Sequence, residues 1–214
     1  AKEIAAGLDK PLIVQYFVWL WQLLQGNLGY SMKSYEPVSA MIGSHIGPTL
    51  LLMGASLTLS LLIAVPAGIY SAVKQYSKGD YAVVTASFIG SSIPSFFLAL
   101  ILIYIFTVKL GILPSGGMNT LGMDGSVADT IRHMVLPVTV LAVSLAGSNI
   151  RYIRSSFLEI LQQDYLRTAR AKGIGYKRVI WKHAMRNALL PIVTVIGMQI
   201  PMLFGGAVII EQVF

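Results

Sequence analysis

The residues with the clearest capacity for chemistry lie in a basic segment, 164–191, which reads DYLRTARAKGIGYKRVIWKHAMRNALLP. Asp164 can accept hydrogen bonds from the free first-turn amides of a short helix, because aspartate is a favoured residue at that position. Gly173 suits the left-handed turn that often follows the last helical residue. We therefore predict one compact helix over 165–172 and interpret the segment as a docking surface.

Two kinds of side chain alternate along this predicted helix. Three residues are apolar or small and would let another surface approach closely: Leu166, Ala169 and Ala171. Three others are cationic and would pair with acidic groups or carbonyl ends: Arg167, Arg170 and Lys172. We expect Ala169 to face a groove on the partner, while the cationic groups contribute less, in a salt-dependent way, at the rim.

A second group of polar residues interrupts the apolar parts of the chain. Its members are Ser92, Pro94, Ser95, Asn149 and Gln199. A proline inside a helix deletes one backbone hydrogen bond and kinks the helix, so the serines either satisfy the freed carbonyls or line a polar path. An amide in lipid must find a partner, which is either another helix or a watery cavity. We predict that these residues border a translocation path, with packing as the alternative.

Motifs for catalysis are missing from the sequence. It contains no Gly-x4-Gly-Lys-Ser/Thr phosphate loop, no His-Glu-x-x-His zinc motif and no cysteine. Residues 54–57 match the Gly-x-Ser-x pattern of intramembrane serine proteases, but no histidine lies well inside an apolar stretch to act as the base. We therefore expect no catalytic residue, no metal site and no cofactor bound by this chain, which is not predicted to be an enzyme.

Composition places these residues in a membrane protein. Hydrophobic residues make up 55% of the 214 residues, charged residues 12%, and the mean hydropathy is +0.70. Four stretches lack Asp, Glu, Lys and Arg, and each is long enough to cross or nearly cross the hydrocarbon core of a bilayer: 47–73, 81–108, 134–150 and 187–210. The fold class predicted is all-α, a polytopic bundle of membrane helices.

The distribution of charge gives the orientation of that bundle. The net charge is +7, and eleven of the sixteen Lys and Arg residues fall in segments 74–80 and 151–186. A topology of four helices puts both segments on one side of the membrane, so the positive-inside rule makes that side cytoplasmic and 109–130 extracellular. The charge is therefore explained without a nucleic-acid partner, and we expect a multi-pass protein of the cytoplasmic membrane.

The rest of the chain supplies the elements that hold these residues. We divide it into an amphipathic segment on the extracellular side, 1–46, and a transmembrane domain, 47–214, with a cytoplasmic loop at 156–186. An apolar helix is expected near 11–24, and Gly47-Pro48-Thr49 is expected to open the first span. Small residues recur every four positions in that span, at Ser56, Ser60, Ala64 and Gly68, a pattern that favours close helix packing in lipid.

The basic segment resembles the loop by which ABC importer permeases contact their ATPases. Ala169, Gly173, Leu190 and Pro191 match that family's motif, whereas Arg167 and Thr168 stand where Glu and Ala are usual, and Pro191 lies five residues too far along. These departures resemble the dipeptide, oligopeptide and nickel branch. The Ser-x-Pro-Ser-Phe stretch at 92–96 is similar to that family as well, and the resemblance covers 8–214.

The resemblance implies a type I transmembrane domain in a permease subunit that imports di- or oligopeptides, with nickel as the alternative substrate. It implies a second permease subunit, two cytoplasmic ATPase subunits that hold ATP and Mg, an extracellular substrate-binding protein and membrane lipid as partners. It also implies that this chain is a fragment lacking the first and last helices. The coupling residues would be Asp164, Tyr165, Leu166, Arg167, Ala169, Arg170, Ala171, Lys172 and Gly173.

Two other classes of protein remain open. A secondary transporter or channel needs no ATPase, but such proteins commonly carry intramembrane charges or internal repeats. A structural assembly subunit would not need polar breaks at Ser92, Pro94 and Gln199. The basic segment could also serve only as a positive-inside signal in contact with anionic lipid, which would not require a cap at Asp164, a stop at Gly173 and a restart at Leu190-Pro191.

Overall fold

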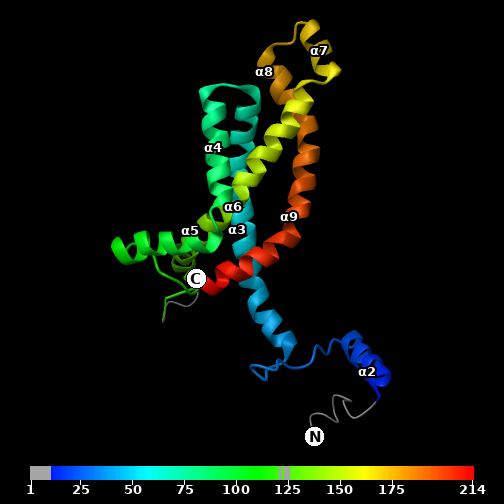
Figure 1. Cartoon of the computed structure of the whole chain (residues 1–214). Coiled ribbons are helices and arrows are strands. Elements are labelled where there is room, and N and C mark those ends of the chain that lie inside the picture. Colours follow the sequence, from blue (N-terminus) through cyan, green and yellow to red (C-terminus); the bar gives the residue numbers. More distant parts are fainter. Residues whose placement is uncertain (1–10, 121, 123–125) are drawn as a thin grey trace. The chain divides into compact units, whose positions relative to one another are not determined.

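The structure is a computed structural model that describes residues 11–120, 122 and 126–214. Every regular element in that part of the chain is a helix, with one isolated bridge between Tyr30 and Pro37 (Figure 1). The predicted all-α class is therefore confirmed. Two compact units are present, the first extending to Leu50 and the second covering Leu51–Phe214. The predicted domain boundary after residue 46 falls inside a helix, and the functional residues considered below all belong to the second unit.

The first unit contains α2 (Leu12–Leu24) and the beginning of α3 (Val38–Val73). Helix α2 starts directly after Pro11, whose fixed φ suits the residue before a helix, and the helix predicted near 11–24 is confirmed. Helix α3 begins nine residues before Gly47, so the predicted start of the first span is wrong. Pro48 deletes only the hydrogen bond to the carbonyl of Ser44, and one missing bond does not end a helix of 36 residues.

The second span is broken at the predicted proline. Helix α4 (Lys78–Ser92) ends just before Pro94, and α5 (Ser95–Leu102) continues into the π-helix η1 (Ile103–Lys109) at 95° to α4. The predicted kink at Pro94 is confirmed, and it is sharp enough for α5 to run across the direction of α4 (Figure 1). Among the residues that the structure describes, three helices are long and apolar enough to cross a membrane, and there are four spans when this bent pair is counted as one.

The third long helix, α6 (Val127–Leu161), extends past both ends of the apolar stretch 134–150. Ser126 caps its first turn by accepting a hydrogen bond from the amide of Asp129. Arg151 and Arg154 lie on the turns by which α6 continues beyond residue 150. Helix α6 therefore runs from one end of the second unit to the other, and its side chains are available for contacts along this whole length.

The last helix starts earlier than predicted. The chain is continuously helical from Tyr176, through α8 (Tyr176–Arg178), the π-helix η2 (Val179–Ala184) and α9 (Met185–Val213). Pro191 lies inside α9, so the predicted restart at Leu190-Pro191 is wrong. The missing amide of Pro191 removes one bond from a helix that is already under way, and packing on both sides of it keeps the helix intact.

Close helix packing organises the second unit. Ser56, Ser60, Ala64 and Gly68 are all buried, which confirms the predicted packing stripe on α3. A Cβ atom placed on Gly68 would lie 2.9 Å from Cγ2 of Ile153 on α6, so the two backbones approach as closely as glycine allows. On the other side of α6, Gly147 meets Ser87 and Ser91 of α4 in the same manner.

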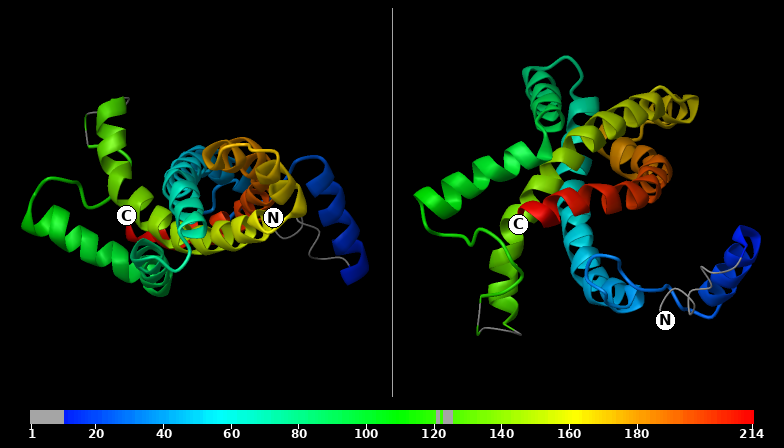
Figure 2. Two further views of the ribbon diagram at one scale, coloured as in Figure 1. Left: turned by 90° about the horizontal axis from the view of Figure 1, so that it is seen from above. Right: turned by 60° about the horizontal axis from the view of Figure 1, so that its bottom comes forward.

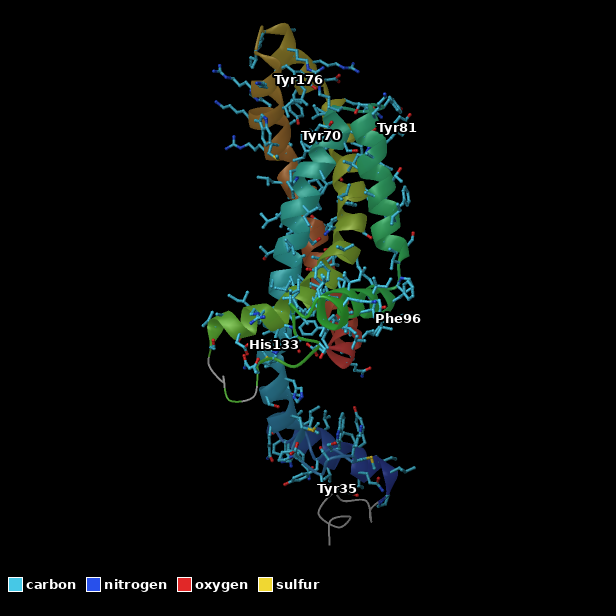
Figure 3. All side chains as sticks on the ribbon, turned by 90° about the vertical axis from the view of Figure 1, so that its left-hand side faces the viewer. Tyr35, Tyr70, Tyr81, Phe96, His133 and Tyr176 are labelled. Atoms are coloured by element: carbon cyan, nitrogen blue, oxygen red, sulfur yellow. The ribbon has the colours of Figure 1, made fainter. Side chains whose placement is uncertain are left out.

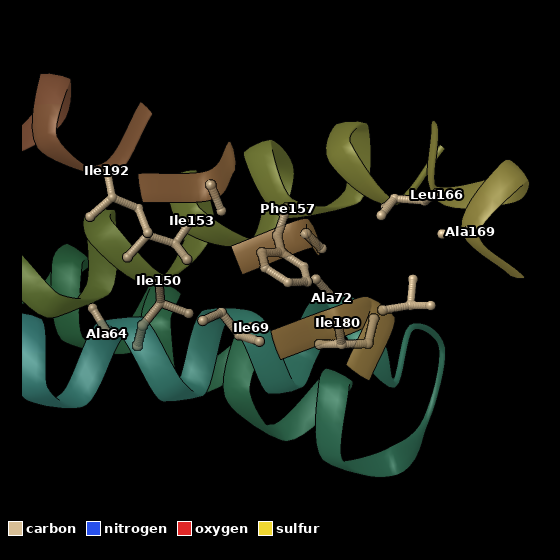
Figure 4. Packing of buried hydrophobic residues seen from close by; sticks show 13 residues of the cluster. Ala64, Ile69, Ala72, Ile150, Ile153, Phe157, Leu166, Ala169, Ile180 and Ile192 are labelled. Atoms are coloured by element: carbon tan, nitrogen blue, oxygen red, sulfur yellow. The ribbon is translucent and has the colours of Figure 1, made fainter. Parts of the chain in front are cut away.

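The largest apolar cluster lies where α3, α6 and the last helix meet (Figure 4). Phe157 is fully buried near its centre, between Ile153 of its own helix and Ile180 of η2. The cluster continues past Phe157 to Leu166 and Ala169, which belong to the short helix α7 (Asp164–Ala171). The basic segment is thus packed onto the membrane helices rather than held away from them.

The two basic parts of the chain, the connection between α3 and α4 and the segment that contains α7 and α8, lie at one end of the second unit. The connection between α3 and α4 and the elements α7 and α8 share the upper end in Figure 1, and the views from other directions in Figure 2 keep α4, α6 and α9 side by side. Tyr70, Tyr81 and Tyr176 mark this end in Figure 3, and His133 lies towards the other. The arrangement agrees with the expected topology, in which this end is cytoplasmic.

The contact between α3 and α6 can be tested by replacing either of two glycines of α3 with leucine. We expect Gly68→Leu to lower the free energy of unfolding by about 1–3 kcal/mol, because the added atoms would overlap Ile153 and the carbonyl of Ile150. Gly54→Leu is the matched control, since a Cβ atom at Gly54 meets nothing within 4 Å. Thermal unfolding of the two variants in the same detergent is the measurement, and equal midpoints would contradict the predicted close contact.

Candidate functional site

The short helix α7 (Asp164–Ala171) is the predicted docking helix, displaced by one residue at each end. Gly173 follows it with φ +78°, which confirms the predicted left-handed stop. The predicted cap is wrong: Gln163 occupies the cap position, and Asp164 is the first helical residue with no side-chain cap hydrogen bond. The carboxylate of Asp164 instead lies 3.5 Å from the guanidinium of Arg167, and both groups are exposed.

The apolar face of α7 is covered by the chain itself. Leu166 is fully buried and Ala169 is 8% exposed, and both pack in the cluster that contains Val179 and Ile180 of η2 (Figure 4). The expectation that Ala169 faces a partner's groove is therefore wrong, because the sequence pattern shows a small face without showing what covers it. The exposed residues of α7 and its end are Asp164, Tyr165, Arg167, Thr168, Arg170, Ala171 and Lys172.

Two polar contacts add to this packing. The Nδ2 atom of Asn187 on α9 donates a hydrogen bond of 2.7 Å to the hydroxyl of Tyr165. The guanidinium of Arg170 lies 5.5 Å from the ring centroid of Tyr176, at the start of the last helix. Since α7 is attached at both of its ends and along its apolar face, a force on α7 would be transmitted to the helix that carries Gln199.

Two of the predicted pathway residues meet inside the bundle. Nδ2 of Asn149 donates to Oγ of Ser60 at 3.1 Å and to Oε1 of Gln199 at 3.2 Å, and Nε2 of Gln199 donates in return to Oδ1 of Asn149. Asn149 is only 1% exposed. This amide contact, formed by Ser60, Asn149 and Gln199, joins α3, α6 and α9. Of the two partners considered from the sequence for such an amide, another helix or a watery cavity, the structure shows another helix.

The other three predicted pathway residues lie elsewhere, at the bend between α4 and α5. Ser92 and Pro94 are exposed and Ser95 is half-buried. No hydrogen bond connects them to the amide contact among the residues that the structure describes. The structure therefore brings Asn149 and Gln199 together but leaves Ser92, Pro94 and Ser95 as a separate group, whose place in a pathway stays a prediction.

Sequence reasoning missed the role of Arg151. Its NH1 atom donates to the carbonyl of Ser87 at 3.1 Å and to Oγ of Ser91 at 2.9 Å, and its guanidinium lies 4.7 Å from the ring centroid of Phe88. Arg151 thereby fixes α6 against α4. The sequence signal was the spacing of Ser87 and Ser91, which places both on one face of a helix, but nothing in the sequence says which cation they meet.

An ion pair between Asp80 and Arg154 was missed as well. Nε of Arg154 lies 2.8 Å from Oδ1 of Asp80 and its NH2 atom donates to Oδ2, also at 2.8 Å. The same carboxylate accepts hydrogen bonds from the hydroxyl of Ser71 and from the amide of Tyr76. Through Ser71, Asp80 and Arg154 these contacts join α3, α4 and α6. Asp80 is 2% exposed, so its carboxylate is protected from solvent. Asp80 is the lone acid in the basic segment 74–80, which was its signal.

The opposite end of α6 has its own polar cluster. The carboxylate of Asp129 accepts from the amide of Thr120 at 2.6 Å and from its hydroxyl at 2.9 Å. Nδ1 of His133 lies 3.0 Å from the carbonyl oxygen of Asp129, within hydrogen-bonding distance. Within the described part of the chain, no group of three or more His, Asp or Glu side chains is placed to hold a metal ion.

Comparison with known proteins identifies the family. Residues 64–214 match the family model described as "binding-protein-dependent transport system inner membrane component". The chain belongs to this family. Its predicted resemblance to ABC importer permeases of the peptide branch is thus confirmed, as is its place among multi-pass proteins of the inner membrane.

Three relatives illustrate the branch. The chain is 51% identical over 209 residues to a putative peptide permease protein of Brucella ovis, and 46% identical over 209 residues to the oligopeptide transport system permease protein AppB of Bacillus subtilis. It is 41% identical over 208 residues to the glutathione transport system permease protein GsiC of Pectobacterium atrosepticum. These alignments cover 97% of the chain and 66%, 66% and 65% of the relatives, so the chain spans just under two thirds of their length.

The buried ion pair of this permease gives a stability prediction. We expect Arg154→Met to lower the free energy of unfolding by about 3 kcal/mol, because it leaves the carboxylate of Asp80 buried without its cation. Adding Asp80→Asn should recover part of this loss. The control is Arg167→Met, which removes an exposed pair and should cost less than about 1 kcal/mol. Chemical denaturation measures both, and equal stability of the two single variants would refute the assigned role of Arg154.

The amide contact predicts energetic coupling between two helices. In a double-mutant cycle of Asn149→Leu and Gln199→Leu, we expect a coupling energy of about 0.5–1.5 kcal/mol, the range found for hydrogen bonds between membrane helices. Thr194→Val serves as the control partner, since the hydroxyl of Thr194 donates to the carbonyl of Leu190 on its own helix. If the effects of Asn149→Leu and Gln199→Leu simply add, the two amides do not hold the helices together.

Proposed function

We propose that this chain is the transmembrane permease subunit of a binding-protein-dependent ABC importer that carries di- or oligopeptides across the cytoplasmic membrane. Family membership supports the transport role. The names of the three relatives refer to peptides, oligopeptides and glutathione, which favours a peptide over nickel as the substrate. The observation that carries the proposal is the attachment of α7, with its exposed basic face, to the helix that bears Gln199.

In this proposal the chain is a non-catalytic subunit. ATP and Mg bind to two cytoplasmic ATPase subunits, an extracellular binding protein delivers the substrate, and a second permease subunit completes the channel. The exposed face of α7 contacts an ATPase subunit. Its cations suit an acidic or carbonyl-rich groove, and the small residues Thr168 and Ala171 permit a close approach.

The coupling step follows from the contacts of α7. When the ATPase subunits close on ATP they displace α7, and the displacement passes through Leu166, Ala169 and Tyr165 to the last helix. That helix holds Gln199, whose amide pairs with Asn149. Breaking this pair separates α6 from α9 and opens the path, and the two amides then bind water or substrate. ATP drives the change because it binds one of the two states better.

The same contacts give the predicted pathway residues different tasks. Asn149 and Gln199, with Ser60, act as a closing contact between helices. Ser92, Pro94 and Ser95 mark the bend from which α5 diverges, where the exposed polar groups are available to a substrate. An ATPase-independent carrier is the second candidate, and it would need no docking face on α7.

The docking face can be tested by adding a charge to its outer side. We expect Ala171→Glu in the full-length permease to leave insertion and stability unchanged, because Ala171 is exposed, while the ATPase subunits no longer co-purify or respond to substrate. The matched control is Ala82→Glu, an exposed alanine on α4 near the same end, which should retain both properties. Ala169→Glu is unsuitable because it would disrupt the internal packing of α7.

Co-purification and substrate-stimulated ATP hydrolysis are the two measurements. Normal values for Ala171→Glu would refute docking through α7, and the ATPase-independent carrier would then be favoured.

A further inference from the structure

One face of the last helix carries charged side chains that take no part in the internal packing. Arg178, Lys182 and Arg186 follow one another at intervals of four residues, and all three are exposed. The opposite side of this segment is buried in the main apolar cluster through Val179, Ile180, Ala184 and Ala188. Figure 3 shows long side chains ending in nitrogen that project outward from the segment that begins at Tyr176. The three cations therefore form a stripe directed away from the bundle.

In the part of the chain that the structure describes, no acid pairs with the stripe. Within residues 11–120, 122 and 126–214, the ion pairs are those of His133 with Asp129, Arg154 with Asp80 and Arg167 with Asp164. None of them involves Arg178, Lys182 or Arg186. An anion that pairs with the stripe must accordingly come from outside the described chain.

The surroundings of the stripe indicate which anion this is. Trp181 lies beside Lys182 and is 64% exposed, as expected for tryptophan at the level of lipid headgroups. One turn further along the same helix the exposed residues become apolar, with Leu189, Leu190 and Val193 all exposed. A helix whose outer face changes from cations, with a tryptophan among them, to aliphatic residues has the order of a helix that passes from a headgroup layer into the hydrocarbon core.

We propose that Arg178, Lys182 and Arg186, together with Trp181, form a surface that binds the anionic phospholipid headgroups of the cytoplasmic leaflet. The charges are complementary, and the aliphatic residues that continue the face contact the acyl chains of the same lipids. The stripe lies at the end of the second unit that also holds the α3–α4 turn and α7, which is the cytoplasmic end in the expected topology (Figure 1). This surface is separate from the exposed face of α7, so it can exist whether or not α7 docks an ATPase.

The test uses Trp181 as a local probe. The full-length permease, with every other tryptophan replaced by Phe, is placed in nanodiscs that contain either a brominated anionic phospholipid or a brominated zwitterionic one. Bromine quenches tryptophan only at short range, so the quenching reports which lipid lies beside Trp181. We expect at least about a fivefold preference for the anionic lipid, the effect of a single basic residue near a membrane surface, and a loss of the preference at high salt.

Two matched sets of substitutions distinguish the effect of the stripe from the effect of the net charge. Arg178→Gln, Lys182→Gln and Arg186→Gln together should bring the preference to about parity. Glutamine is a good helix former, and circular dichroism checks that the helix persists. The control removes the same charge from exposed lysines at the same end, through Lys74→Gln, Lys78→Gln and Lys172→Gln, and should retain the preference.

Three results would overturn the proposal. One is equal quenching of Trp181 by the two brominated lipids in the parent protein, and another is an equal loss of preference in the control. The third is that the stripe variant keeps the lipid preference but loses the ATPase subunits, which would make the stripe a protein-docking surface. Failure of the Ala171→Glu test would leave the lipid preference unaffected, so the two proposals can fail separately.

Discussion

The close approach of α3 and α6 is the constraint on which the remaining contacts of the second unit depend. Lipid supplies no hydrophobic force between helices, so association relies on packing of small residues and on interhelical hydrogen bonds. Ser56, Ser60, Ala64 and Gly68 let the backbones come together, and only at that separation does the short hydroxyl of Ser60 reach Asn149. Asn149 is then oriented to meet Gln199, so packing on one side of α6 determines the polar contact on its other side.

Polar contacts of different strength occur along α6. At the end near α7, Arg154 and Asp80 make a bidentate ion pair with further bonds to Ser71 and Tyr76, and breaking such a buried pair is costly. Farther along the helix only neutral amides and a hydroxyl connect α3, α6 and α9, and each such bond averages about 0.6 kcal/mol in membrane helices. The polar contacts consequently join α3, α4 and α6 more strongly than they join α9 to α6, which also depends on apolar packing. In the proposed alternation between two states, the weaker polar contact is the one that breaks.

Local features of the sequence predicted the structure well, and contacts between distant residues explain the errors. The apolar stretches, the packing stripe, the bend at Pro94 and the turn at Gly173 follow from hydropathy, spacing and backbone preference, and all are present. The start at Gly47 and the restart at Pro191 were wrong because a proline was given more weight than the helical turns on either side of it. Ala169 was assigned to an external contact because the partner of a small face, here Val179 and Ile180, cannot be inferred from spacing within one helix.

The π-helix η2 explains how one segment serves two surfaces. In an α-helix, residues four apart drift around the axis, so a stripe of three would turn away from a fixed direction. The wider turn of a π-helix reduces this drift, which keeps Val179 and Ala184 directed at the bundle while Arg178 and Lys182 remain on the outside. The inner side of η2 receives Leu166 and Ala169 of α7, and its outer side carries the cations and Trp181. In the proposed coupling, a force on α7 reaches the same segment of the last helix that carries the proposed headgroup surface, because both surfaces belong to one continuous helix.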